Sequence, residues 1–146
     1  MGLDMYLEGH KFLHNFNLAE RDEHGCATQL PLTMEDGFEV KEKVLRLGVW
    51  RKHPNLHGYI VEKYAKNAED DCRPISLSKE NLADIIKAIK GNKLPVTKGF
   101  FFGQSYWDAE KKEHDAKDIA TLEAAIAWLE TDEEGVWRGV EYVANW

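Results

Sequence analysis

Residues 50–57, W-R-K-H-P-N-L-H, gather the side chains best suited to hold a small ligand. Arg51 offers a planar fork that grips phosphate or carboxylate through two hydrogen bonds, and Lys52 adds a point charge. A helix that begins near Pro54 would add free backbone N–H groups and a positive dipole end, which also favour an anion. Trp50 would serve as a stacking platform. The alternative is a strand end with solvated charges and a packed Trp50.

Histidine and cysteine spacing raises two further possibilities. His53 and His57 are four residues apart, which places two imidazoles on one helix face for zinc. No Glu follows His53 and no third ligand lies nearby in the sequence, so we expect no metal and no cofactor. Asp71 and Cys72 would act with His57 as the acid, nucleophile and base of a small hydrolase or transferase. A cysteine buried at the start of a strand is the competing interpretation, and no catalytic residue is assigned.

The segment G-F-F-F-G, residues 99–103, lacks the Gly-Lys-Ser/Thr of a phosphate-binding loop. In a strand, Phe100 and Phe102 share one face and Phe101 lies on the other. One face belongs to the core, whereas the other either packs on a helix or lines an aromatic pocket. The flanking glycines permit a close approach of other backbone.

Hydrophobic periodicity defines the elements that position these residues. Alternation predicts strands over residues 2–8, 38–50 and 136–143, and short apolar runs predict strands over 72–78 and 99–103. If Leu45, Leu47 and Val49 face the core, then Arg46 and Trp50 share the opposite face. Residues 14–37 are polar, contain Gly and Pro breakers, and predict a long loop or flap.

Three helices are expected. Leu56, Ile60 and Tyr64 recur at helical spacing after Pro54, although Gly58 weakens that helix by about 1 kcal/mol. Ser78 is a good N-cap for a helix over 79–90, and an acidic helix over about 109–130 has a charged, solvated first half. The pattern predicts one α+β domain, residues 1–146, with a mixed, largely antiparallel sheet of four or five short strands and about three helices.

Charge and composition exclude several classes of protein. The 146 residues carry a net charge of −7, which argues against binding of long nucleic acid. Residues 108–134 hold ten acidic residues against three lysines, whereas residues 41–53 hold five basic residues against one acid. No apolar run is long enough to span a membrane and no secretory signal is visible. Two cysteines are too few for a disulfide framework, and a reduced, cytoplasmic protein is expected.

The order of several motifs resembles an uncharacterised family of small phage and bacterial proteins, some of which carry the label phosphoglycerate kinase. The motifs are M-G-L-D-M-Y-L, W-R-K-x-x-N-L-H-x-Y, D-C-x-x-I, L-P-x-T-x-G-F-F-F-G and a C-terminal Trp. A two-domain kinase does not fit in 146 residues, and no kinase glycine loop is present. The landmark residues of the resemblance are Asp4, Tyr6, Trp50, Arg51, Lys52, His57, Cys72, Phe100–Phe102 and Trp146. The tail departs from the family, because A-N-W replaces Ser-Ser-Trp.

These features favour a non-catalytic binder of a small anionic, ring-containing, nucleotide-like ligand over an enzyme. The expected ligand-binding residues are Trp50, Arg51, Lys52, His57, Phe100, Phe102, Trp146, Tyr6 and Cys72. The phage resemblance implies a sharper version, an anti-defence protein that sequesters a host signalling nucleotide. Two alternatives stay open: the hydrolase or transferase with His57, and an inhibitor or adaptor that docks on a host protein through the acidic residues 108–134. No membrane partner is expected, and the sequence leaves a homo-oligomer open.

Overall fold

Three ten-residue strands, β1 (Asp4–Leu13), β6 (Glu42–Arg51) and β8 (Val136–Asn145), form most of an antiparallel sheet. The short strand β7 (Ile75–Leu77) completes this sheet in the order β6-β1-β8-β7. The computed structural model describes residues 2–97 and 109–146. The α+β class and the largely antiparallel sheet are as predicted, although β1 and β8 are longer than expected and β6 begins four residues later than the predicted strand over 38–50. The predicted strand over 99–103 lies outside the described residues.

A β-bulge in β6 changes which of its side chains reach the core. Leu7 of β1 lies opposite Gly48, but its neighbour Glu8 lies opposite Arg46. Leu47 is therefore an extra residue without a partner on β1. Because side chains alternate along a strand, this one insertion reverses the face of every residue that follows it.

The reversal places Trp50 on the helix-covered face of the sheet, opposite Met5, where it is only 9% exposed. The prediction that Trp50 shares the opposite face with Arg46 is wrong for this reason. Arg46 does lie on the uncovered face, where its guanidinium sits 4.3 Å from the centre of the Tyr6 ring. Val49, predicted to face the core, lies on the uncovered face instead.

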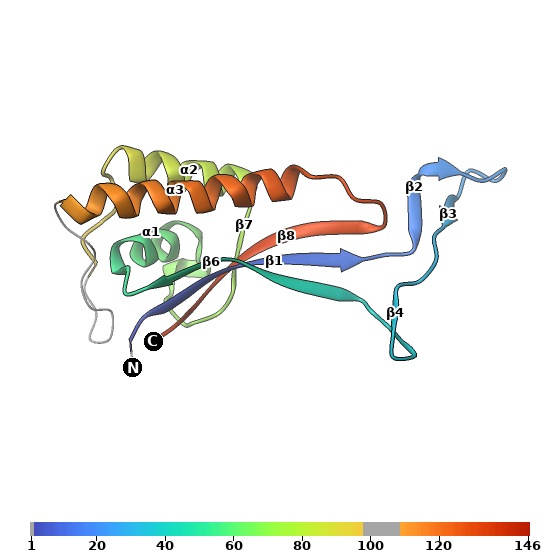
Figure 1. Cartoon of the computed structure of the whole chain (residues 1–146), viewed down its shortest axis with the longest axis horizontal. Coiled ribbons are helices and arrows are strands. Elements are labelled where there is room, and N and C mark those ends of the chain that lie inside the picture. Colours follow the sequence, from blue (N-terminus) through green and yellow to red (C-terminus); the bar gives the residue numbers. More distant parts are fainter. Residues whose placement is uncertain (1, 98–108) are drawn as a thin grey trace.

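All three helices pack on one face of the sheet, at the end where the two termini lie (Figure 1). They are α1 (Pro54–Tyr64), α2 (Lys79–Lys90) and α3 (Ala109–Glu130), with a short 3-10 turn η1 (Lys66–Ala68) after α1. α2 and α3 lie side by side over the sheet. The predicted apolar stripes are buried or packed against the core, as they should be if hydrophobic burial drives the packing. Ser78 caps α2 in a reciprocal capping box with Asn81.

Gly58, an unfavourable residue for the interior of α1, has a packing reason. A Cβ atom at this position would lie 2.0 Å from Oγ1 and 2.8 Å from Cβ of Thr97. The loop that follows α2 is held there by a hydrogen bond of 3.0 Å from the Thr97 N–H to Asn55 Oδ1. Glycine at this position lowers the helix propensity of α1, but it leaves room for the close contact with the loop at Thr97.

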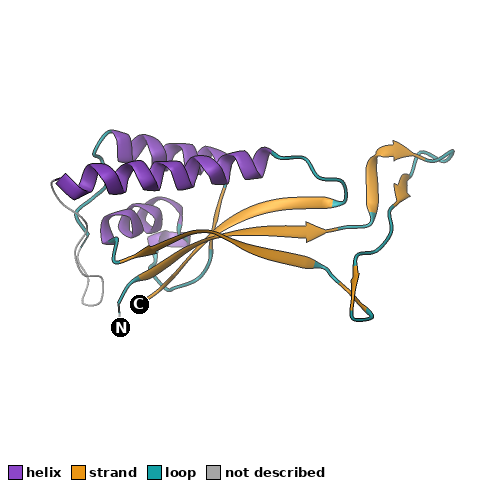
Figure 2. Cartoon of the chain, in the orientation of Figure 1, coloured by secondary structure: helices purple, strands orange, loops and turns teal. Residues whose placement is uncertain are grey.

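Residues 14–41 form an arm that projects beyond the sheet, at the end away from the helices (Figures 1 and 2). Where a loop was predicted over 14–37, the arm has two hairpins, built from β2 (Phe16–Arg21) with β3 (Ala27–Gln29) and from β4 (Met34–Glu35) with β5 (Phe38–Glu39). β5 occupies the first two residues of the predicted strand over 38–50. The second hairpin turns at Asp36-Gly37, where both residues have positive φ, as a type I′ turn requires. This dipeptide was the available sequence signal for the hairpin.

Candidate functional site

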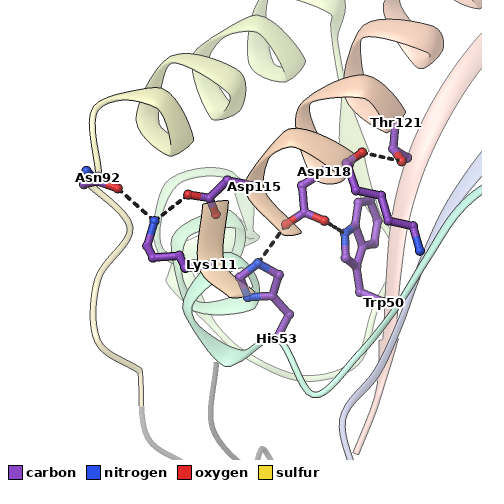
Figure 3. A network of polar contacts seen from close by, with 8 residues as sticks. Trp50, His53, Asn92, Lys111, Asp115, Asp118 and Thr121 are labelled. Carbon is purple, nitrogen blue, oxygen red and sulfur yellow. Dashed lines mark hydrogen bonds and ion pairs between the residues drawn. The ribbon is translucent and has the colours of Figure 1, made fainter. Parts of the chain in front are cut away.

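Trp50 and His53 are both held by a buried carboxylate of α3. The Trp50 indole Nε1–H donates to Asp118 Oδ1 at 2.7 Å, and His53 Nε2 lies 3.0 Å from Asp118 Oδ2 (Figure 3). Asp118 is only 4% exposed. Each of its two oxygens therefore has a hydrogen-bonding partner, as a buried carboxylate needs. This network joins the end of β6, the first residue before α1, and α3.

The burial of Asp118 corrects the expectation that the first half of α3 is wholly solvated. One turn earlier, Asp115 behaves as expected, because it pairs at the surface with Lys111, which also reaches Asn92 (Figure 3). The Asp118 carboxyl group can be buried because two hydrogen-bonding groups, of Trp50 and His53, meet it inside the protein. Charge counting along the helix could not distinguish these two aspartates.

His57 belongs to a second network, between α1 and the C-terminal strand. Its Nδ1 lies 2.6 Å from the Tyr142 hydroxyl and its Nε2 lies 2.9 Å from Asp70 Oδ2, and His57 is 2% exposed. The Trp146 indole N–H donates to the other oxygen of Asp70 at 3.1 Å. Burial raises the pKa of Tyr142 well above its usual value, and the neighbouring Asp70 and Cys72 add to this shift.

The second network offers little room for a substrate. The cavity beside His57, Cys72 and Tyr142 measures about 10 Å³, roughly the space of a single water molecule. Asp70, not the predicted Asp71, contacts His57, while Asp71 pairs with Arg73 at 3.1 Å. Cys72 is half-buried and has a left-handed backbone, with φ of +60°. This arrangement supplies a positioned imidazole but no described cavity for a nucleotide.

Arg51 and Lys52 lie at the surface, away from the buried networks. Arg51 follows Trp50 by one residue and so projects from the opposite, uncovered face, where its Nε lies 3.3 Å from Asp4 Oδ1. Lys52 is exposed and has a left-handed backbone, with φ of +55°. The predicted ligand residues thus divide into a buried set, Trp50 and His57, and an exposed set, Arg51, Lys52 and the partly exposed Trp146.

The remaining predicted ligand residues are dispersed. Tyr6 lies on the uncovered face of the sheet under Arg46, and Cys72 lies beside the second network. Phe100 and Phe102 lie outside the described residues. The structure therefore brings Trp146, Cys72 and His57 to one network, places Trp50 in another, and leaves Arg51 on the other side of the sheet.

A larger groove lies where the arm leaves the sheet, and sequence reasoning did not identify it. Its volume is about 470 Å³, and it lies between β2 and the turn from α3 into β8. Its lining residues are His14, Phe16, Asn17, Glu20, Asp132, Glu133, Glu134, Gly135, Val136 and Trp137. We call these ten residues the acidic groove.

The aromatic side of the acidic groove is open to solvent. Trp137 is 59% exposed and Phe16 is exposed as well, although both are large apolar side chains. The Trp137 ring packs on His14, with ring centres 4.7 Å apart. The His14 N–H donates to the Gly135 carbonyl at 2.8 Å, which ties the base of the arm to the start of β8. Exposed apolar side chains around a hollow indicate a binding surface.

The acidic side of this groove keeps most of its negative charge. Glu133 is neutralised by Lys11, whose Nζ lies 2.9 Å away, and by Arg138 at 3.3 Å. The hydrogen bond from Lys11, aided by Arg138, holds the pKa of Glu133 below its usual value. Among the described residues, no cation pairs with the other three carboxylates, Glu20, Asp132 and Glu134. The groove therefore presents three uncompensated acids beside two exposed rings.

The residues missed from the sequence had only weak signals. Asp70 and Tyr142 lie next to or within expected strands, but contacts that span 13 and 85 residues of sequence cannot be read from spacing. The acidic run 132–134 belongs to the docking segment 108–134 that the sequence predicts, but in the structure it follows the end of α3 and lines the acidic groove.

The fold and these sites define an α+β protein with two buried histidine networks and an open acidic, aromatic groove. Comparison with models of protein families, with curated proteins and with solved structures found no match. Among residues 2–97 and 109–146, no group of three or more His, Cys, Asp or Glu side chains is arranged to hold a metal ion. None of the helices in this part of the chain is long and apolar enough to cross a membrane.

Proposed function

We propose that the protein is a non-catalytic binding protein whose acidic groove takes a basic, arginine- or lysine-bearing segment of a partner protein. The observation that supports this is that exposed rings and carboxylates without a described cation partner surround one hollow of about 470 Å³. Trp137 and Phe16 would cover the apolar stem and the cationic head of a basic side chain. Glu20, Asp132 and Glu134 would supply its counter-charges.

The arm extends this surface beyond the groove. Phe38, which is 76% exposed, and the exposed Leu32 and Met34 lie on the arm with little to cover them in the monomer. Protein-binding surfaces usually combine exposed apolar and aromatic residues at the centre with a polar or charged rim, and the arm and the acidic groove together have this composition. The sequence alone suggested an adaptor that docks through the acidic residues 108–134. In the function proposed here, a partner docks on residues 132–137 and the arm in place of the helix 109–130.

Binding of a fluorescein-labelled peptide with six arginines, measured by fluorescence anisotropy, tests the groove. An otherwise identical peptide with six glutamines is the ligand control. We expect the arginine peptide alone to bind, with an affinity that falls as salt rises. Trp137→Ala should weaken binding several-fold, because a surface cation–π contact contributes about 0.5–1 kcal/mol. Glu134→Gln should weaken it by a similar factor, since an exposed ion pair contributes about 0.2–1 kcal/mol.

The matched control is Glu123→Gln, which removes one exposed carboxylate from α3 outside the acidic groove. It should leave the affinity within a factor of two of the wild type. An equal loss of peptide affinity in Glu134→Gln and Glu123→Gln would show that the peptide binds only through non-specific charge attraction. Undetectable binding of the arginine peptide at low salt would exclude the proposed function.

A second candidate, the small anionic, ring-containing ligand, is supported by the exposed side chains at the other end of the sheet. Asp4 pairs with Arg51 on one side and with Asn145 on the other. Arg51 and the C-terminal residues thus lie about 10 Å apart across two strand spacings. Lys52 and Trp146 lie at the same end, although Trp146 is tied to Asp70 on the helix-covered side, so a nucleotide-sized molecule would meet both the cation and the ring only by crossing the end of the sheet. Asp4 and Asp70 oppose an anion there, which makes this candidate the weaker one.

Thermal-shift measurements with mono-, di- and cyclic nucleotides test this second candidate. A stabilising nucleotide should lose its effect in Arg51→Ala and keep it in Arg21→Ala, which removes an exposed arginine from the arm. A shift that survives Arg51→Ala would exclude Arg51 as the anion site. If a nucleotide binds, its sequestration by a phage protein in the host cytoplasm is the corresponding biological role. The unpaired cysteines Cys26 and Cys72 suit that reducing compartment.

A further inference from the structure

The outer edge of β6 is an unpaired strand edge. In the order β6-β1-β8-β7, β6 is terminal, and in the part of the chain that the structure describes it pairs with β1 alone. Its remaining backbone N–H and C=O groups are available to another strand, and native proteins usually block such edges with charges, prolines or bulges. The bulge at Leu47 limits the regular part of the edge to residues 42–46.

These five residues, E-K-V-L-R, are complementary to themselves in antiparallel pairing. If Val44 lies opposite its own copy, Glu42 of each chain lies opposite Arg46 of the other, and the two ion pairs form on the same face. Glu42, Val44 and Arg46 share the uncovered face, because their partners on β1 are Phe12, His10 and Glu8. Opposite charges directly across an antiparallel pair are stabilising, and like charges are destabilising.

From this pattern we infer that the protein forms a symmetric dimer through antiparallel pairing of β6 with β6 of a second copy, with the two-fold axis at Val44. A second copy suits the site because a two-fold interface requires a self-complementary patch. Val44 is 55% exposed in the monomer, and the pairing would cover it. The acidic groove is not required for this interface.

The charged side chains of this edge contact residues of β1 in the monomer, on the same uncovered face as Val44. Arg46 lies over the Tyr6 ring, with 4.3 Å between the guanidinium carbon and the ring centre, which restricts its conformations before pairing. Glu42 hydrogen-bonds His10, the partner of Val44 on β1. Antiparallel pairing also directs the β4–β5 hairpin of each copy toward the Val49 end of the other strand. Exposed Phe38 and exposed Val49 would there approach each other.

Two charge reversals provide the test. In Arg46→Glu alone, both cross-strand pairs become acid against acid, and in Glu42→Arg alone both become base against base. Each variant should weaken dimerisation by roughly tenfold or more, because two attractive pairs turn repulsive. An equal mixture of the two variants restores two opposite-charge pairs and should form a heterodimer. Sedimentation-velocity ultracentrifugation over a micromolar concentration series measures the masses.

We expect the wild type to approach twice the chain mass of 16.8 kDa. The two variants should sediment as monomers by themselves and as a dimer when mixed. Circular dichroism checks that each variant is folded, and formation of the heterodimer independently shows that both are competent. The control Glu80→Arg, an exposed charge reversal on α2, should remain dimeric. A wild type that stays monomeric at 100 µM, or variants that stay dimeric alone, or a mixture that fails to associate would overturn the inference.

Discussion

Replacement of Asp118 by Ala should destabilise the protein strongly, although the sequence places this residue in a charged, apparently solvated stretch. Asp118 accepts hydrogen bonds from Trp50 at 2.7 Å and from His53 at 3.0 Å, and all three side chains are buried. Its removal leaves two buried donors without this acceptor, at about 1–3 kcal/mol each. Breaking one side of a buried charged pair typically costs about 3–5 kcal/mol, which agrees with that sum. Such a loss is a large fraction of the roughly 5–15 kcal/mol that stabilises a domain.

Urea denaturation followed by tryptophan fluorescence measures this effect, with thermal melting as a second readout. We expect a loss of about 3–5 kcal/mol and a melting temperature lower by roughly 10 °C or more. Asp118→Asn keeps one acceptor oxygen and should lose less. The matched control is Asp115→Asn, one turn earlier on α3, whose surface pair with Lys111 should contribute less than about 1 kcal/mol. Equal losses in Asp118→Ala and Asp115→Asn would show that Trp50 and His53 are not held as described.

Three further measurements address other contacts. Hydrogen bonds from Tyr64, Tyr59 and Lys63 lower the pKa of Asp84 to about 2 from 3.8, so its stabilising contribution is present above pH 4 and is lost as the pH falls toward 2. In Asp84→Asn the urea midpoint should therefore depend less on pH between 4 and 2 than in the wild type. The same pH dependence in both proteins would contradict this role of Asp84. Tyr142→Phe removes the hydroxyl 2.6 Å from His57 Nδ1 and should cost about 1–3 kcal/mol in chemical denaturation, so a neutral result would mean that this hydrogen bond contributes nothing. Gly58→Ala should lower the melting temperature because the new Cβ would lie 2.0 Å from Thr97 Oγ1, whereas helix propensity alone predicts a gain of about 1 kcal/mol.

The sequence predicted the elements where periodicity is strong and failed where a single residue breaks it. The stripe of Leu82, Ile85 and Ile89 predicted α2 correctly, because a helix repeats its apolar face every three to four residues. The bulge at Leu47 has no such signature, since one inserted residue leaves the alternation intact on either side. The face of Trp50, and with it the proposed ligand site of residues 50–57, therefore could not be read from the sequence.

The candidate site shows the same limit for contacts between distant residues. Residue types and spacing singled out Trp50 and His57, and the family resemblance added Trp146; each has a specific polar partner in the structure. Their partners Asp118 and Tyr142 lie 68 and 85 residues away in sequence, so only folding could join them. The acidic groove likewise forms from the base of the arm and the turn after α3, which are more than 100 residues apart.

What the sequence by itself determined is the local part of the structure: amphipathic helices, capping at Ser78, strand alternation and the overall negative charge. These properties depend on neighbours within a few residues, so short-range physical rules suffice to predict them. Tertiary structure alone decided which polar groups are buried together and which charges stay uncompensated. Both depend on long-range packing, where the desolvation of a side chain and the partner that offsets it come from different parts of the chain.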